Sequence, residues 1–329
     1  MTTNREIRLA SRPTGEPTPD NFELTTVDLP EPAEGQVLVR NTWMSVDPYM
    51  RGRMDAGDSY IEPFSLGRVL EGHAVGEVVA SRNADLPVGA TVLHFAGWRE
   101  YAVLDDATVV DVSIARPQDY LNGLGQTSFT AFLAVTEVAR VRPGDIVFVS
   151  GAAGAVGSAA GQLARLYGAT HVIGSAGGPS KARLLTEEFG FDTAIDYRAG
   201  SLTEQLSAAA PDGIDVYIDN VGGSHLEAAI TALNPRGRIA AIGMISTYNA
   251  PVPGPTNLYD IVLKQLILQG FLVTDHLDRL AAYIPQAARW LADGTLRTQE
   301  TVVEGLDKAP HAFLGLLQGT NTGKMLVRL

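Results

Sequence analysis

The sequence contains no cysteine, and this absence removes several kinds of chemistry at once. Disulfide bonds, thiolate zinc sites, iron–sulfur clusters and a cysteine nucleophile all need that side chain. The chain also has no run of about 18 apolar residues free of charge, so it predicts no membrane-spanning helix. The first residues, Met1–Leu9, lack the apolar core of a secretory signal, and we predict a cytoplasmic protein.

Positive charge is scarce as well. The chain has 25 Lys and Arg against 37 Asp and Glu, a formal net charge of −12. Such a balance repels a phosphate backbone and argues against a nucleic-acid partner. The length of 329 residues suffices for about two domains, and 45% hydrophobic residues supply sizeable cores.

The two halves of the chain differ in the order of their predicted strands and helices. Strand-like segments separated by turn residues dominate residues 5–110, namely Gln36–Arg40, Val75–Val79, Thr91–Phe95 and Glu100–Leu104. Beyond about residue 120, helical segments alternate with six strand-like ones, Asp145–Ser150, His171–Ser175, Thr193–Asp196, Ile214–Asp219, Arg238–Ile242 and Leu268–Val273. This alternation predicts an α/β domain with a doubly wound parallel sheet of six strands.

Two helix starts and the C-terminal tail complete the predicted organisation. Ser201–Glu204 and Ser224–Glu227 both have the spacing of a capping box. The tail Gly323–Leu329 is strand-like and is predicted to return to the β-rich part. We therefore predict one domain from residues 1–120 with 305–329 and a second from residues 121–304.

A glycine-rich turn follows the first strand of the alternating region. Gly151, Gly154 and Gly157 follow the apolar strand and precede a helix rich in small residues. The spacing is G-x-x-G-x-x-G, a variant of the dinucleotide fingerprint. Glycine lets the backbone approach a pyrophosphate, which then binds the free N–H groups at the helix N-terminus. A tight strand–helix turn without a ligand is the alternative.

The second strand of this region indicates which dinucleotide is bound. NAD sites place an acidic residue about 20 residues after the turn, where it accepts from the ribose 2′-hydroxyl. Here His171–Ser175 ends without an acid, and Lys181 follows in the next turn. Tyr197, after the third strand, adds a hydroxyl. A lysine and a hydroxyl suit a 2′-phosphate, so the sequence favours NADP(H).

Six strings spread over nearly the whole chain carry a resemblance to a known family. They are Ser45–Gly52, Ala152–Ser158, Gly161–Ala164, Asp219–Gly223, Gly243–Asn249 and Gly319–Lys324. These strings resemble the zinc-independent medium-chain reductases, in the group of prostaglandin reductase, leukotriene B4 12-hydroxydehydrogenase and curcumin reductase. The resemblance implies a GroES-like β-barrel lobe, a Rossmann lobe that binds NADP(H), and a homodimer. It also implies reduction of the C=C bond of small apolar α,β-unsaturated ketones and aldehydes.

The resemblance assigns site residues by position. Its pyrophosphate turn matches Gly154, Ala155, Val156 and Gly157, and its 2′-phosphate contacts match Lys181 and Tyr197. Further cofactor contacts match Asn220, Ile242, Gly243, Met244, Ile245, Ser246, Thr247, Tyr248 and Asn321. A segment that lines both nicotinamide and substrate matches Phe271, Leu272 and Val273. For Ile242 and Leu272 we predict side chains in the core and only backbone contacts to ligand.

One departure from the family pattern concerns a tyrosine before the last Rossmann strand. The matching stretch here is Ile261–Leu266, with Leu263 or Lys264 in the place of the tyrosine. Tyr259 is nearby but about one helical turn out of register. The sequence leaves open whether Tyr259 or Lys264 takes that place.

Zinc alcohol dehydrogenases share the two-lobe plan, which makes zinc an alternative to test. They carry a cysteine where this chain has Ser45–Asp47, and a Gly-His-Glu string where it has Gly72–Ala74. His73 alone cannot form a zinc site, which needs three or four protein ligands. We predict no metal, and His73 is interpreted as a structural residue or a pocket wall.

In the absence of a metal, positioned donors must stabilise the charge that builds on the carbonyl oxygen of the substrate. Tyr60, in a loop similar to the substrate loop of the family, is the catalytic candidate. Tyr49 is the second, although Asp47 and Arg51 beside it predict a hydrogen-bonded corner with a structural role. Water or a ribose hydroxyl of the cofactor remain alternatives. The predicted substrate pocket comprises Tyr49, Tyr60, Phe271, Leu272 and Val273, with His94, Trp98 and Tyr248 as further candidate walls.

Two other functions remain open at the level of sequence. A quinone reductase of the same fold would use the same hydride delivery on a planar acceptor. A protein that binds NADP(H) without catalysis, such as a redox sensor, would keep the phosphate turn but not a substrate slot.

Overall fold

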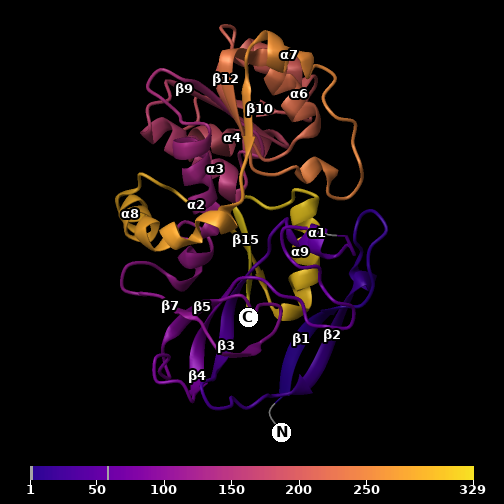
Figure 1. Cartoon of the computed structure of the whole chain (residues 1–329), viewed down its shortest axis with the longest axis vertical. Coiled ribbons are helices and arrows are strands. Elements are labelled where there is room, and N and C mark those ends of the chain that lie inside the picture. The colour runs from indigo at the N-terminus through magenta and orange to yellow at the C-terminus, as the bar shows by residue number, and fades with distance from the viewer. Residues whose placement is uncertain (1–2, 58) are drawn as a thin grey trace. The chain divides into compact units, whose positions relative to one another are not determined.

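The computed structural model describes residues 3–57 and 59–329, and it divides into two compact units (Figure 1). The first unit contains Met1–Leu121 and Glu300–Leu329, and the second contains Asn122–Gln299. The sequence placed the return to the first domain at residue 305, which is wrong. Strand β14 (Glu300–Glu304) pairs in parallel with β15 (Lys324–Arg328), so it belongs to the first unit.

The first unit is built mainly from strands. They are β1 (Thr3–Leu9), β2 (Phe22–Asp28), β3 (Val37–Ser45), β4 (Ala74–Ser81), β5 (Thr91–His94), β6 (Tyr101–Leu104), β7 (Thr108–Val109), β14 and β15. The main sheet has the order β14-β15-β3-β4-β5-β7, with β6 on β3, and β1 pairs with β2. Its helices are α1 (Met50–Arg53) and α9 (Ala309–Leu317). The predicted return of the tail is confirmed, since β15 pairs antiparallel with β3.

Aromatic side chains fill the core of the first unit. The Trp98 ring stacks on Phe22 with ring centroids 6.2 Å apart, and its edge meets Phe313 of α9 at 6.3 Å. Trp98 is 1% exposed. The interpretation of Trp98 as a pocket wall is therefore wrong, because its large apolar ring is enclosed by the core instead.

The second unit is an α/β layer structure. Its strands are β8 (Ile146–Val149), β9 (His171–Ala176), β10 (Thr193–Asp196), β11 (Ile214–Asp219), β12 (Leu233–Ala241) and β13 (Ile267–Gly270). They form one sheet in the order β10-β9-β8-β11-β12-β13, and every pair is parallel. Its helices are α2 (Gln126–Leu133), α3 (Ala155–Leu166), α4 (Pro179–Glu187), α5 (Leu202–Ala209), α6 (Gly223–Ala232), α7 (Tyr259–Leu263) and α8 (Leu280–Asp293). The predicted six-stranded doubly wound sheet is confirmed.

Alternating side chains along the central strands explain why helices cover both faces of this sheet. Val147 and Val149 of β8 belong to a core cluster with residues of α2, α3 and α8. Phe148, between them, belongs to a second cluster with residues of α5 and α6. Because successive strand residues point to opposite faces, a continuous apolar strand needs a helical layer on each side.

The two predicted capping boxes have different outcomes. Ser201 caps α5, and its side chain accepts a hydrogen bond from the Glu204 backbone N–H. Ser224 caps nothing, because α6 begins at Gly223 with Gly222 as its N-cap. Gly222 has a φ of 70°, a conformation that suits glycine far better than serine.

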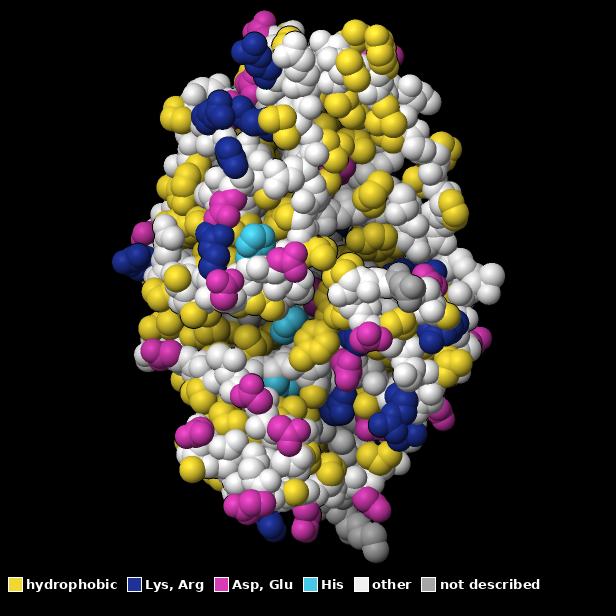
Figure 2. Space-filling model, in the orientation of Figure 1, with side chains coloured by type: hydrophobic (Ala, Val, Ile, Leu, Met, Phe, Trp, Pro, Cys, Tyr) yellow, Lys and Arg dark blue, Asp and Glu magenta, His cyan; other side chains and the backbone are white. Residues whose placement is uncertain are grey.

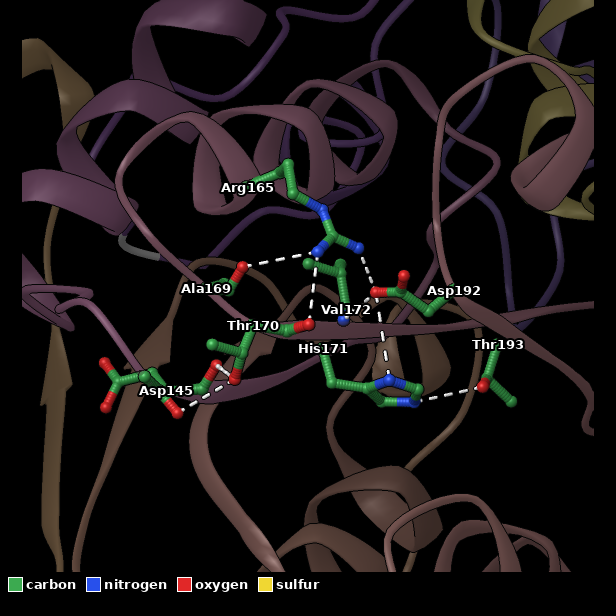
Figure 3. A network of polar contacts seen from close by, with 9 residues as sticks. Asp145, Arg165, Ala169, Thr170, His171, Val172, Asp192 and Thr193 are labelled. Carbon is green, nitrogen blue, oxygen red and sulfur yellow. Dashed lines mark hydrogen bonds and ion pairs between the residues drawn. The ribbon is translucent and has the colours of Figure 1, made fainter.

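A polar network closes the edge of the sheet where β9 and β10 begin (Figure 3). Asp192 pairs with Arg165 from the end of α3 and accepts from the Val172 backbone N–H at 2.7 Å. His171 Nε2 lies 3.0 Å from the Thr193 hydroxyl. Arg165 also donates to two backbone carbonyl groups, at 3.4 and 3.2 Å. The network joins helix and strands at the amino ends of the strands, and the opposite edge is left for a ligand.

In the described part of the chain, no helix has the length and apolar character needed to cross a membrane.

Candidate functional site

The glycine turn joins β8 to α3 as the sequence predicts. Gly151 has a φ of 58°, and Gly154, the N-cap of α3, donates from its N–H to Gly151 O at 3.0 Å. Ala152 N–H donates to Ser175 O at 2.9 Å, which fixes the turn against the end of β9. No side chain caps α3 and no acidic residue occupies its first turn. The helix therefore presents backbone N–H groups and the positive end of its dipole to an anion.

Close packing, against backbone at one position and against an aromatic ring at the other, explains two glycines of this region. A Cβ on Gly157 would lie 2.4 Å from Gly151 O and 2.7 Å from the Ala152 Cα. A Cβ on Gly161, one helical turn later, would lie 2.0 Å from the Phe191 ring. These contacts let α3 start directly on the turn and pack against the sheet, as a pyrophosphate cradle requires.

A buried polar cluster organises the end of β11. The Tyr217 hydroxyl lies 2.7 Å from Asp219 Oδ1 and 2.9 Å from Ser150 Oγ. The same carboxylate oxygen accepts from the N–H groups of Val221 at 2.9 Å and Gly222 at 2.8 Å. Burial raises the pKa of Asp219, and the hydrogen bonds from Gly222 and Tyr217 oppose that rise. The cluster fixes the loop that begins at Asn220.

Asn220 is held at both its backbone and its side chain. Its N–H donates to Ser150 Oγ at 3.0 Å, and its Nδ2 donates to Ser150 O at 2.8 Å. With Nδ2 bonded in this way, the side-chain Oδ1 is an acceptor that makes no hydrogen bond with the described residues. Asn220 thus lies next to the glycine turn, and its contact with the cofactor stays a prediction.

The stretch Ile242–Tyr248 runs beside the β11 loop. Ile242 and Gly243 donate to Asp219 O at 2.8 and 3.2 Å, and Ser246 Oγ donates to Val221 O at 2.6 Å. The predicted segment is therefore brought to the carboxyl edge of the sheet, near Asn220. Burial raises the pKa of Tyr248, which keeps its phenol neutral.

The last predicted strand ends earlier than expected. β13 stops at Gly270, and Val273 begins a 3-10 helix, Val273–Arg279. Leu272 is 38% exposed, so its assignment to the core is wrong. Phe271 packs against the sheet core and lies 6.4 Å from the His276 ring. Phe271 and Val273 are partly buried, and their predicted role in lining the nicotinamide and substrate stays a prediction.

The predicted 2′-phosphate residues lie on two neighbouring turns. Lys181 is half-buried in the first turn of α4, and Tyr197 directly follows β10. The Tyr197 ring meets the buried His225 ring edge-on at 5.1 Å, and burial lowers the pKa of His225 to about 4. The His225 imidazole is therefore neutral at pH 7, and it packs against the Tyr197 ring without adding a charge.

In the first unit the two candidate tyrosines differ in environment. Tyr60 is 57% exposed. The Tyr49 hydroxyl is buried and has no hydrogen-bond partner among the described residues. Burial and the nearby Asp47 charge raise the pKa of Tyr49 well above its ordinary value. A buried hydroxyl without a partner costs free energy, so its persistence calls for an explanation.

The corner next to Tyr49 contains the hydrogen-bonded backbone that the sequence predicts, and its charged side chains pair outside it. Asp47 pairs with the buried Lys324 of β15 and with the Ser45 hydroxyl, and not with Arg51. Burial raises the pKa of Asp47, but the Lys324 charge and these hydrogen bonds lower it below its ordinary value. Arg51 pairs with Asp55 instead, at 2.9 Å. The predicted corner is therefore hydrogen-bonded through its backbone, since the Arg51 N–H donates to Pro48 O at 3.0 Å, while the two charged side chains have separate partners.

The remaining predicted residues have clear places. Asn321 is 7% exposed in the first unit, and its Nδ2 donates to Gly323 O at 2.8 Å. Lys264 donates to the Ile230 and Thr231 carbonyl groups at the end of α6. Tyr259 is 70% exposed on α7. Lys264 thus acts as a helix cap, a role that the family tyrosine does not suggest.

Comparison with known proteins agrees with this geometry. Residues 5–112 match a family model described as the N-terminal domain of oxidoreductase, and residues 155–293 match one described as zinc-binding dehydrogenase. The chain is 38% identical to an NADPH-dependent curcumin reductase of Escherichia coli, over 99% of this chain and 97% of that protein. It is 36% identical to an NADP-dependent 2-alkenal reductase of Nicotiana tabacum, over 98% and 97%. The chain belongs to the medium-chain reductases.

A solved structure extends the comparison to this medium-chain reductase's fold. The crystal structure of CurA from Vibrio vulnificus in complex with NADPH aligns with a TM-score of 0.94 and 40% identity. The alignment covers 98% of each chain. This relative, which has the same fold over the length of both units, was crystallised with NADPH.

The second family model is described as zinc-binding, which raises the question whether this medium-chain reductase has residues that could bind a metal ion. The His73 ring meets the Phe95 ring edge-on at 4.8 Å. In the stretch Ser45–Asp47, where zinc alcohol dehydrogenases carry a cysteine, the Ser45 hydroxyl donates a hydrogen bond to the Asp47 carboxylate. Across the residues that the structure describes, no three His, Asp or Glu side chains gather in a way that could hold a metal ion.

The tertiary structure brings together one predicted group of residues in the second unit. Gly154–Gly157, Asn220 and Ile242–Tyr248 meet at the carboxyl ends of β8, β11 and β12. The sequence analysis missed Ser150, Tyr217 and Asp219, which hold the Asn220 loop. Asp219 is the acidic last residue of an apolar strand and directly precedes Asn220, and this signal could have found it.

Proposed function

We propose that this medium-chain reductase reduces the C=C bond of α,β-unsaturated ketones and aldehydes with NADPH. One observation supports the cofactor site: α3 has no side-chain cap at its N-terminus, and its Gly157 lies so close to the backbone of Gly151 and Ala152 that only glycine fits there. Relatives named curcumin reductase and 2-alkenal reductase supply the substrate class. NADP(H) is the cofactor, and when bound it supplies the hydride.

The residues of the second unit would hold the cofactor at successive points. The backbone N–H groups of Ala155, Val156 and Gly157 would bind the pyrophosphate. Lys181 and Tyr197 would bind the 2′-phosphate, one as an ammonium and one as a hydroxyl donor. Further contacts are proposed for Asn220, for Ile242–Tyr248 and Phe271–Val273 of this unit, and for Asn321.

Replacement of Lys181 by alanine tests the cofactor assignment. A charge-assisted hydrogen bond contributes about 1.5–3 kcal/mol, so we expect the Kd for NADPH to rise about 10- to 100-fold. The Kd for NADH should stay the same, because it has no 2′-phosphate. Isothermal titration calorimetry measures both, and Arg183→Ala, an exposed cation on the same helix, is the control. An unchanged preference for NADPH would remove Lys181 from the site.

Tyr49 is proposed as the donor that stabilises negative charge on the substrate carbonyl oxygen. Its hydroxyl lacks a partner among the described residues, and its raised pKa keeps it protonated at neutral pH. A neutral phenol can donate to an oxygen that gains charge during the reaction. Tyr60 is exposed to solvent, which weakens a hydrogen bond from its hydroxyl. These observations support Tyr49 ahead of Tyr60, the first candidate from the sequence.

Replacement of each tyrosine by phenylalanine separates the two candidates. We expect Tyr49→Phe to lower kcat on an enone about 100-fold, the typical effect of a positioned donor, while Tyr60→Phe changes kcat less than about threefold. Removal of an unsatisfied buried hydroxyl should not lower the melting temperature of Tyr49→Phe. The reverse order of kcat values would assign the role to Tyr60. Full activity in both variants would leave water or a ribose hydroxyl as the donor.

A panel of acceptors tests the activity itself. NADPH oxidation is followed at steady state with enals, enones and quinones under the same conditions. We expect turnover of enals and enones with saturation of the C=C bond in the product. Turnover of quinones alone would favour the quinone reductase, and binding of NADPH without any turnover would favour the sensor.

We further propose that two copies pair through β13 and α7, in keeping with the homodimer of the family. β13 is the last strand of its sheet, and Ile267 and Leu268 are 55% and 43% exposed. Val262 and Leu263 of α7 are more exposed still. Figure 2 shows hydrophobic side chains gathered over this part of the second unit. An open apolar edge strand is a template for another strand, and a second copy supplies an identical one.

A charge placed on this edge tests the dimer. We expect the wild-type protein to have twice the chain mass by light scattering, and the double variant Leu263→Glu/Ile267→Lys to have the mass of one chain. Val88→Lys, an exposed apolar residue of the first unit, is the matched control. A monomeric wild-type protein would contradict the proposal. The cytoplasmic location stays a prediction of the sequence.

A further inference from the structure

Two turns at the carboxyl edge of the sheet are fastened to each other by one carboxylate. Gly177 and Gly178 follow β9, and Tyr197 and Arg198 follow β10. Asp196 Oδ1 accepts from the Gly178 N–H at 2.8 Å and from the Arg198 N–H at 3.0 Å. The carboxylate therefore turns toward backbone donors and holds the two turns at a fixed spacing.

The Arg198 side chain shares a small space with the Tyr197 phenol. A Cβ built on Gly177 would lie 2.8 Å from the Tyr197 hydroxyl and 2.9 Å from Arg198 Nε. The Arg198 Cζ lies 5.7 Å from the centre of the Tyr197 ring. Because Gly177 has no side chain, the Tyr197 hydroxyl and the Arg198 guanidinium can both lie next to its backbone. A side chain at residue 177 would fill that space.

Lys181, in the first turn of the helix that follows Gly177 and Gly178, is a second cation near enough to be affected by the Arg198 charge. After burial, the largest effect on the pKa of Lys181 is the Arg198 charge, which lowers it. Arg198 is exposed and makes no ion pair with any residue that the structure describes. The Arg198 charge disfavours the charged form of Lys181, and a bound anion would offset that repulsion. In a chain of net charge −12, such a pair indicates an anion site.

We propose that Arg198 is a second cationic ligand of the 2′-phosphate and a determinant of the preference for NADPH over NADH. The inference rests on the proposed function and adds a residue to it. A guanidinium presents a planar fork of N–H donors to phosphate oxygens, whereas the Lys181 ammonium acts as a point charge. The Tyr197 hydroxyl donates to a third oxygen. A nucleotide with a free 2′-hydroxyl gains little from these donors.

Calorimetry on the full chain tests the proposal with two pairs of ligands. We expect Arg198→Ala to raise the Kd for NADPH about 10- to 100-fold and to leave the Kd for NADH within about twofold. Adenosine 2′,5′-bisphosphate should lose affinity to the same extent and 5′-AMP should not, which places the effect at the 2′-phosphate. Arg198→Lys should recover part of the loss, since it keeps the charge without the fork.

Two further variants make the outcome specific. Gly177→Ala should also weaken NADPH more than NADH, because its methyl group enters the shared space. Arg183→Ala removes an exposed cation from α4 and should leave both affinities unchanged. Equal losses for NADPH and NADH in Arg198→Ala, or no loss, would overturn the proposal. If Lys181→Ala still weakened NADPH selectively, the 2′-phosphate site would stand and only Arg198 would be removed from it. If neither variant had an effect, the cofactor assignment itself would fail.

Discussion

Replacement of Gly157 by alanine is expected to weaken NADPH binding about 100-fold, because a displaced turn loses hydrogen bonds to the charged pyrophosphate that are worth about 1.5–3 kcal/mol each. The added Cβ would meet Gly151 O at 2.4 Å and the Ala152 Cα at 2.7 Å. Both contacts are with backbone, so no side chain can rotate away. The turn must move, and Ala152 loses its position against Ser175 O.

The same variant separates binding from folding. Overpacking of this kind costs about 1–3 kcal/mol of stability, which leaves most domains folded. Circular dichroism should show an intact fold while calorimetry shows weak binding of both NADPH and NADH, since the pyrophosphate is common to them. Gly254→Ala, where a Cβ meets nothing within 4 Å, is the matched control. Normal affinity in Gly157→Ala would mean that the turn does not bind the pyrophosphate.

Replacement of Lys324 by methionine is expected to destabilise the first unit by about 3–5 kcal/mol, because it leaves a buried carboxylate without its partner. Lys324 is 2% exposed and pairs with Asp47, which is itself buried. Without Lys324, the Asp47 carboxylate would keep its hydrogen bond from the Ser45 hydroxyl, but that hydroxyl carries no charge to balance it. Chemical denaturation followed by tryptophan fluorescence measures the loss, since Trp98 lies in the core of this unit.

A second substitution tests whether the ion pair itself is responsible. Asp47→Leu/Lys324→Met removes both charges and should recover at least half of the lost free energy of unfolding. Lys308→Met, an exposed lysine of the same unit, should change stability by less than about 0.5 kcal/mol. If Lys324→Met alone cost less than about 1 kcal/mol, the buried pair would be no support of this unit.

Local patterns were sufficient for much of the fold. Continuous apolar strands such as Ile146–Val149 alternate with helices, and only a doubly wound sheet buries both their faces. Local patterns did not determine where each element begins and ends, because these limits depend on tertiary contacts. β14 was assigned to the wrong unit since its partner, β15, lies far along the chain. The Ser224 cap failed because the positive φ at Gly222 starts α6 earlier.

The candidate site divides in the same way. The glycine turn was readable because its residues are contiguous, and the structure keeps Gly154 as the N-cap of α3. Lys181 and Tyr197 were found by position, but Arg198 was not, because its approach to Gly177 joins two separate turns. The order of Tyr49 and Tyr60 also depended on burial, which no local pattern reports.

The sequence by itself determined the layer architecture, the phosphate turn and the absence of thiol chemistry, since each depends on residue type and short-range spacing. The tertiary structure decided which charges are paired and which polar atoms are left without partners. Lys324 meets Asp47 across 277 positions of sequence, and Tyr217 meets Ser150 across 67. Such contacts depend on how strands are ordered in a sheet, and that order is a property of the folded chain as a whole.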